Sequence, residues 1–436
     1  MRPRQTKPRL LQAMIDAFSL PDLRRRILFT LMILVIFRFV AHVPLPGVNL
    51  EALEQLFESN ALLGMLDMFS GGAMRKFSVA AMGVYPYITA SIIMMLLVPV
   101  IPRLQAMSQE GEAGKNKVNL ITHWLTVPLA GLSGYGQLVY LQREGVVATT
   151  TLLPTITIVI SLIAGTIFLV WLGELITEYG IGNGISIIIF GGIVAGYPQM
   201  ISQGFVAGEQ YGGLAIYLLI VLATILVIVI FTEAHRRIPV QYARSVFRGG
   251  RMYRQAGSTH IPMRVNNTGM IPLIFAMSVV IFPGVVASYF VNPAEPGFAD
   301  TVSRLFSPNT TLPTGLFYWG FYFLLAVGFT FFYSMITYQQ QDLPGVLQRQ
   351  GGFIPGIRPG KNTAGYLNGV ANRITWAGAL FLACVAIMPF IAKLITSVQA
   401  IQISSLGLLI VVGVVLDTMK QLEAQLVMRR YEGFIK

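Results

Sequence analysis

Long apolar stretches alternate with short polar ones along the whole chain. We count ten stretches of about 20 mostly apolar residues, the length that an α-helix needs to cross the roughly 30 Å hydrocarbon layer of a bilayer. They lie at 25–43, 78–100, 119–141, 153–172, 184–203, 212–232, 269–290, 315–338, 374–394 and 403–421. The pattern predicts an all-α polytopic membrane protein with ten transmembrane helices.

Composition agrees with this class. The 436 residues are 54% hydrophobic and 11% charged, with a mean hydropathy of +0.66. A soluble domain has about 25% charged residues. The first residues, "MRPRQTKPRLLQAM", are basic and polar, unlike a cleavable signal peptide. The single cysteine, Cys384, excludes an intrachain disulfide and a C-x-x-C metal site.

Basic residues are distributed unevenly between the connecting segments. If the N-terminus is inside, 25 of the 31 lysines and arginines fall in inside segments and five in outside segments. Cytoplasmic segments of membrane proteins carry this excess, so both termini are predicted to be cytoplasmic. The remaining residue, Arg38, lies near the outer end of the first stretch, where a snorkelling side chain is expected.

Two long cytoplasmic loops are predicted at 233–268 and 339–373. Aromatic residues lie between the arginines of the first loop, at Tyr242, Phe247 and Tyr253. This mixture favours a surface that docks a partner, and RNA phosphate is one ligand that such a surface would bind. The alternative explanations of the positive charge in this loop are the general positive-inside bias of membrane proteins and attraction to anionic lipid. The first loop contains Arg236, Arg237, Arg244, Arg248, Arg251 and Arg254, and the second contains Arg358.

One outside segment, 61–76, is apolar over one short helix and is then interrupted by Ser70-Gly71-Gly72. It is too short to span a bilayer. Its composition fits equally a re-entrant, plug-like helix or an interfacial amphipathic turn.

The sequence contains no enzymatic constellation. H-E-x-x-H and Walker motifs are absent, and all four histidines lie at the ends of apolar stretches or in loops. The "GLSG" stretch at 131–134 resembles an intramembrane protease motif, but close helix packing explains its small residues better. A secondary transporter of a small solute is the alternative function, since ten helices could form two inverted halves. The centres of the stretches lack the acids that ion coupling requires, so a conduit is favoured.

Five segments together resemble the SecY family, the main subunits of bacterial protein-conducting channels. They are "DMFSGGA" (67–73), "GVYPYITASII" (83–93), "GELITEYGIGNGISIIIFGGIVAG" (173–196), "STHIPMRVNNTGMIPLIFA" (258–276) and "FIPGIRPGKNTAGYL" (353–367). The resemblance runs from about residue 25 to 432. It implies two inverted five-helix halves, 1–205 and 206–436, around a central hourglass pore. It also implies a channel that passes unfolded secretory polypeptides across the bacterial cytoplasmic membrane and releases membrane segments laterally, without enzymatic activity.

The resemblance also implies roles for individual residues, and it favours the plug interpretation of 61–76. The implied pore ring is Val84, Ile88, Ile185, Ile189, Ile274 and Ile410. The implied plug residues are Leu62, Leu63, Met65, Leu66, Met68, Phe69, Ser70 and Gly71. Thr89 and Phe282 match the facing positions of the lateral gate, and the arginines of the two loops match docking positions.

The partners that the resemblance implies are the small membrane subunits SecE and SecG, the SecA ATPase motor, and the translating ribosome. Unfolded polypeptides with signal sequences, membrane lipid and YidC-type insertases complete the set. No cofactor and no metal is expected.

Overall fold

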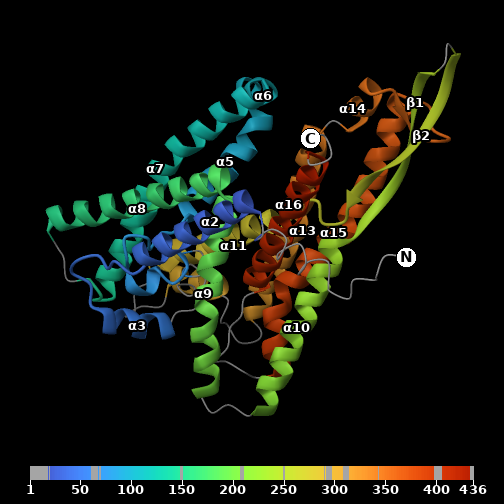
Figure 1. Ribbon diagram of the computed structural model, residues 1–436. Coiled ribbons are helices and arrows are strands. Elements are labelled where there is room, and N and C mark those ends of the chain that lie inside the picture. Colours follow the sequence, from blue (N-terminus) through green and yellow to red (C-terminus); the bar gives the residue numbers. More distant parts are fainter. Residues whose placement is uncertain are drawn as a thin grey trace. The chain divides into compact units, whose positions relative to one another are not determined.

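The structure is a computed structural model. It describes residues 18, 20–59, 67, 70–147, 151–206, 211–248, 251–288, 290, 297–307, 314–341, 343–396 and 405–432. Each of the ten predicted apolar stretches overlaps a helix (Figure 1). These helices are α2 (Pro21–Val40), α5 (Tyr85–Val100), α7 (Glu112–Arg143), α8 (Leu152–Tyr179), α9 (Gly184–Val206), α10 (Tyr211–Glu233), α11 (Ile271–Ser288), α13 (Thr314–Gln341), α15 (Lys361–Thr396) and α16 (Ser405–Glu432).

Length and apolarity separate these helices into two groups. Within the described residues, four helices are long and apolar enough to cross a membrane, and they fall in α8, α10, α13 and α15. Helix α5 and the short α6 (Pro102–Gln109) satisfy the same test only together, across a bend of 103°. The bend lies at Ile101, which is extended, as expected for the residue before Pro102. The number of ten transmembrane helices therefore stays a prediction.

The chain forms two compact units. The first comprises residues 1–207, 281–315 and 410–436, and the second comprises 208–280 and 316–409. The division into halves at 205 and 206 stays a prediction.

In the first unit, α5, α7, α8 and α9 pack against one another in chain order. Glycines make the close approaches possible, because a Cβ atom at Gly184 would overlap the carbonyl oxygen of Gly173. A separate apolar cluster joins α3 (Leu50–Ser59) and the 3₁₀ turn η1 (Met74–Lys76) to the ends of α7 and α8, with Leu53 and Phe77 at its centre.

In the second unit, α10 packs on α15, and the segment between α10 and α11 is not an irregular loop. Strands β1 (His235–Arg248) and β2 (Arg251–Arg264) pair antiparallel over their whole length, as the long hairpin in Figure 1 shows. The second predicted loop contributes α14 (Leu343–Arg349) and β3 (Gly352–Phe353), which joins the sheet in the order β2-β1-β3. The prediction of purely helical structure with two long loops was therefore incomplete here.

The hairpin is held by an apolar core at its base. Ile238 and Val240 of β1 are buried, with Met263 of β2, Leu347 of α14 and Leu367 of α15. Ile238 and Val240 alternate with exposed residues, as expected for a strand with one buried face.

Candidate functional site

The predicted ring residues on α5 lie at the start of that helix. Val84 is the N-cap residue, and its carbonyl oxygen accepts a hydrogen bond of 3.0 Å from the backbone N–H of Ile88. Both side chains are buried, with exposed fractions of 0% and 8%. The four-residue spacing therefore places both on one side of the helix start, as the sequence predicts.

The other ring residues come from three helices. Ile189 of α9 is buried, and Ile185 of the same helix is half-buried. Ile410 of α16 is fully buried in the first unit, and Ile274 of α11 is buried in the second. Five of the six positions are thus buried, and their role as a pore ring stays a prediction.

Only two of the eight predicted plug residues, Ser70 and Gly71, belong to the described part; Leu62, Leu63, Met65, Leu66, Met68 and Phe69 lie outside it. Gly71 has a φ of +68°, which favours glycine. A Cβ atom at Gly71 would lie 2.6 Å from the Cα atom of Gly192 in α9, and one at Gly192 would lie 2.6 Å from the Cα atom of Gly71. The two backbones therefore touch where neither residue carries a side chain.

Arg38 holds the same turn from α2. Its Nη1 donates a hydrogen bond of 2.6 Å to the carbonyl oxygen of Gly71. The guanidinium is engaged by a backbone carbonyl 33 positions further along the chain, and the expectation of a side chain that snorkels to the interface stays a prediction.

Asp67 organises the polar end of this segment. Its Oδ1 accepts hydrogen bonds from the hydroxyl of Ser70 and from the backbone N–H groups of Met74 and Arg75, at 3.1 to 3.2 Å. Its Oδ2 lies 3.1 Å from Nε of Arg75. Burial raises the pKa of Asp67 above its ordinary value, although Arg75 and the hydrogen bonds oppose this. No role was predicted for Asp67 or Arg75 from the sequence, although the acid within the "DMFSGGA" stretch was a visible signal.

The two predicted lateral-gate residues differ in exposure. Thr89 of α5 is half-buried, and its hydroxyl donates to the carbonyl oxygen of Tyr85 at 3.0 Å. Phe282 of α11 is 66% exposed, a large apolar side chain on the surface of the chain. Their pairing as a gate stays a prediction.

The arginines of the first predicted loop lie on the hairpin. Arg236 and Arg237 are exposed, and Nε of Arg237 donates to Nε2 of His235 at 3.1 Å. Arg248 and Arg251 are directly opposed at the last described pair of the ladder. The register also pairs Arg244 with Gln255 and Arg254 with Ser245.

Arg358 is exposed in the turn before α15, and its carbonyl oxygen accepts a hydrogen bond of 3.0 Å from the Thr363 hydroxyl. Strand β3, a few residues earlier, joins this segment to the hairpin through the pairs Gln241 with Phe353 and Tyr242 with Gly352. The basic residues predicted on two separate loops therefore belong to one folded body.

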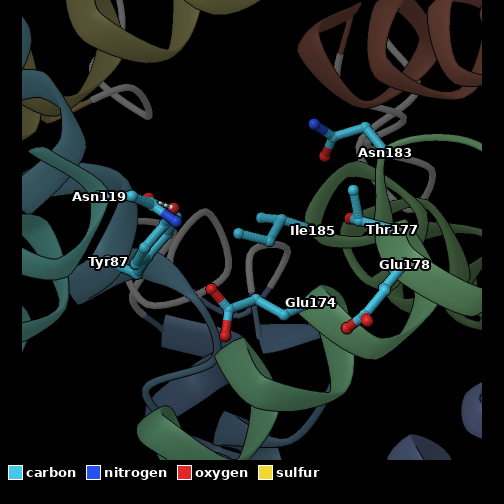
Figure 2. Close-up of a pocket in the computed structure, with 7 residues that line it drawn as sticks. All are labelled: Tyr87, Asn119, Glu174, Thr177, Glu178, Asn183 and Ile185. Atoms are coloured by element: carbon cyan, nitrogen blue, oxygen red, sulfur yellow. Dashed lines mark hydrogen bonds between the residues drawn. The ribbon is translucent and has the colours of Figure 1, made fainter. Parts of the chain in front are cut away.

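A polar pocket of about 330 Å³ lies among α5, α7, α8 and α9 (Figure 2). Figure 2 shows Tyr87 and Asn119 on one side of the space and Thr177, Glu178 and Asn183 on the other. The complete lining is Tyr87, Asn119, Glu174, Thr177, Glu178, Asn183 and Ile185. This pocket was not predicted from the sequence, although the two glutamates four residues apart in "GELITEYGIGNG" were a visible signal.

Hydrogen bonds order this lining. The Tyr87 hydroxyl donates to Oδ1 of Asn119 at 3.2 Å. The Thr177 hydroxyl donates to the Gly173 carbonyl and accepts from the backbone N–H of Gly184, at 3.0 and 2.9 Å, and so fixes the turn between α8 and α9. Oδ1 of Asn183 caps the first turn of α9.

Several helices long and apolar enough to cross a membrane, together with a folded basic body, define a membrane protein of the polytopic class. A SecY family model matches residues 78–419. The SecY protein translocase subunit of Halalkalibacterium halodurans is 45% identical over 434 residues, covering 97% of this chain and 99% of that one. The chain belongs to the SecY family of protein-translocation channel subunits.

Solved structures show the same fold. A protein-conducting channel is similar with a TM-score of 0.64 at 17% identity, covering 95% of this chain and 97% of that one. Sec61 in the canine ribosome-channel complex is similar with a TM-score of 0.63 at 16% identity, covering 95% of this chain and 97% of that one.

Proposed function

We propose that this chain forms a channel through which unfolded secretory polypeptides cross the bacterial cytoplasmic membrane, and from which apolar segments leave sideways into lipid. The observation that carries the proposal is its 45% identity to a SecY translocase subunit over 97% of the chain. Both termini are cytoplasmic in this proposal, as the uneven distribution of basic residues predicts.

The constriction is a ring of Val84, Ile88, Ile185, Ile189, Ile274 and Ile410. Aliphatic side chains expel water from a narrow passage, and this blocks ions without a rigid barrier. They offer a passing polypeptide no specific hydrogen bonds, so transport tolerates any sequence. The match of these positions to the ring positions of the SecY family supports this role.

The segment 61–76 closes the channel as a plug. At its described end, the Gly71 turn is held against α9 by the close backbone contact with Gly192 and against α2 by the hydrogen bond from Arg38. Displacement of the plug would have to break these two contacts, so changes at Gly192 or Arg38 should favour the displaced state.

A lateral exit lies beside Thr89 and Phe282. A sufficiently apolar client segment gains free energy by entering lipid. The exposure of Phe282 supports a position at the edge of the chain, where such a segment would leave.

The hairpin and the Arg358 turn form the cytoplasmic docking body. Arginine presents a fixed fork of donors to phosphate or carboxylate, so one surface can bind ribosomal RNA and an acidic protein. The likeness in fold to Sec61, solved in a ribosome-channel complex, supports the ribosome as one partner. The SecA ATPase is the second, and it supplies the energy. SecE, SecG and YidC-type insertases are the membrane partners.

Reconstitution tests the proposal. The full chain is purified with its co-purifying small subunits, placed in lipid vesicles and supplied with a SecA-type motor, ATP and an unfolded client that carries a signal sequence. Protection of the client from added protease is the expected result. If the client stays digestible while the vesicles take up a small solute, the chain is a transporter and the proposal is wrong.

A further inference from the structure

We propose that the pocket between α5, α7, α8 and α9 binds a lysine or arginine side chain in the n-region of the client's signal peptide; this inference rests on the proposed function. Signal peptides begin with a positively charged n-region that precedes their apolar segment. The pocket would hold that charge while the apolar segment reaches the exit.

The charge of the pocket points to a cationic ligand. Glu174 and Glu178 stand one helical turn apart on α8, and none of the seven described lining residues is a lysine or arginine. Nε2 of His123 lies 3.1 Å from Oε1 of Glu174 without making a hydrogen bond, and Tyr179 is hydrogen-bonded to Glu178. The partners of the two carboxylates are thus an imidazole and a phenol rather than a lysine or an arginine, in a chain whose net charge is +12.

The position of the two carboxylates adds to this preference. Both lie in the last two turns of α8, which ends at Tyr179. The C-terminal end of a helix carries a partial negative charge, which favours a cation, and Nη1 of Arg26 already donates to the carbonyl oxygen of the C-cap residue Gly180 at 3.5 Å. Tyr87 lies on the other side of the pocket, and an aromatic ring can attract an ammonium or guanidinium group.

A side chain fits this lining better than a metal ion. No group of three or more His, Cys, Asp or Glu residues suited to a metal ion occurs in the described part of the chain. The oxygen atoms of Thr177 and Asn183 are already used in fixing the turn into α9. A space of about 330 Å³ between two separated carboxylates and an aromatic ring suits a long, flexible cationic side chain.

The neighbours of the pocket connect it to a translocating client. Ile185, a predicted ring residue, is part of the lining. Tyr87 directly precedes the ring residue Ile88 in α5, and Thr89 of the predicted lateral exit follows. In the proposed orientation, the end of α8 and the start of α9 face the cytoplasm. A signal peptide at the exit therefore has its n-region within reach of Glu174 and Glu178.

The test uses the reconstituted complex and a series of clients that differ only in the n-region, which carries several lysines, one lysine or none. With the unmodified channel, we expect the initial export rate to increase with n-region charge. The double variant Glu174→Gln, Glu178→Gln should export the lysine-rich client about threefold to tenfold more slowly, the effect of losing one or two partly exposed ion pairs. Its rate with the uncharged client should not change.

Two further variants make the result specific. Glu112→Gln removes an exposed acid at the start of α7, outside the pocket, and should preserve the dependence on n-region charge. Glu174→Lys, Glu178→Lys should reverse the preference and favour an n-region that carries acids.

The outcomes separate the two proposals. If the glutamine variant keeps the full dependence on n-region charge, the pocket does not bind the n-region and only this inference is overturned. If the unmodified channel exports no client of the series, the proposed function fails, and the inference fails with it.

Discussion

Gly192→Ala tests the contact that holds the predicted plug. A Cβ atom at this position would lie 2.6 Å from the Cα atom of Gly71 and 3.7 Å from the Phe37 ring. Carbon atoms rest at about 3.5 to 4.0 Å, so the Gly71 turn must move away by roughly 1 Å. The change therefore acts on the plug end more than on the packing around Phe37.

The expected magnitude follows from the cost of overpacking. An added methyl group in a closely packed site costs about 1 to 3 kcal/mol. Alanine also favours the helical state of α9 by about 1 kcal/mol, but α9 is helical whether the plug is seated or not, so this term cancels in the plug equilibrium. The population with a displaced plug should rise about 5-fold to 150-fold.

Resting ion conductance in planar bilayers measures this population. The matched control is Gly196→Ala, one turn further along α9, where an added Cβ atom meets nothing within 4 Å. The control changes helix propensity without the clash, so it should conduct like the unmodified channel. If Gly192→Ala folds and stays as tight as Gly196→Ala, the contact with Gly71 does not hold the plug.

Three further changes address the ring, the motor and the sheet. Replacing Ile88 and Ile189 together by Asn should raise resting conductance several-fold, because amides hold water in a constriction; an unchanged bilayer recording would contradict the ring. Arg358→Glu should reduce SecA-driven export at least tenfold while membrane insertion of the protein, measured by immunoblotting, is unchanged; full export would exclude this residue from docking. Gly352→Ala places a Cβ atom 2.8 Å from Cε1 of Tyr242 and should loosen β3 by about 1 to 3 kcal/mol, seen as faster hydrogen exchange. Gly365→Ala meets no atom and is its control, and equal exchange in the two variants would refute the prediction.

The sequence predicted the elements better than their boundaries and their roles. The second apolar stretch, 78–100, is helical only from Tyr85, because glycine-containing turns occupy the residues before it. The hairpin was predicted as a loop because its many arginines interrupt the alternation of apolar and polar residues that indicates a strand. Val240, Tyr242, Val246 and Phe247 around Gly249-Gly250 carried the signal of a two-residue hairpin connection.

Some residues of the candidate site were predicted from the sequence and others were not. The ring positions came from the family resemblance, since one aliphatic residue in an apolar helix looks like any other. The pocket was missed because its lining comes from four helices, and Glu174 and Tyr87 are far apart in sequence. The hydrogen bond of Arg38 was not predicted, because its partner is a backbone carbonyl and no pattern of side chains in the sequence indicates such a contact.

The sequence by itself determined that this is a mostly helical membrane protein of the SecY family. Apolar length and motif spacing are properties of single segments, so they can be read without knowing what each segment packs against. Only the tertiary structure decided that Gly71 rests on Gly192, that β3 joins the basic hairpin, and that two glutamates share a pocket with Tyr87. These contacts depend on how distant segments approach within ångströms, and that is set by packing of the whole unit.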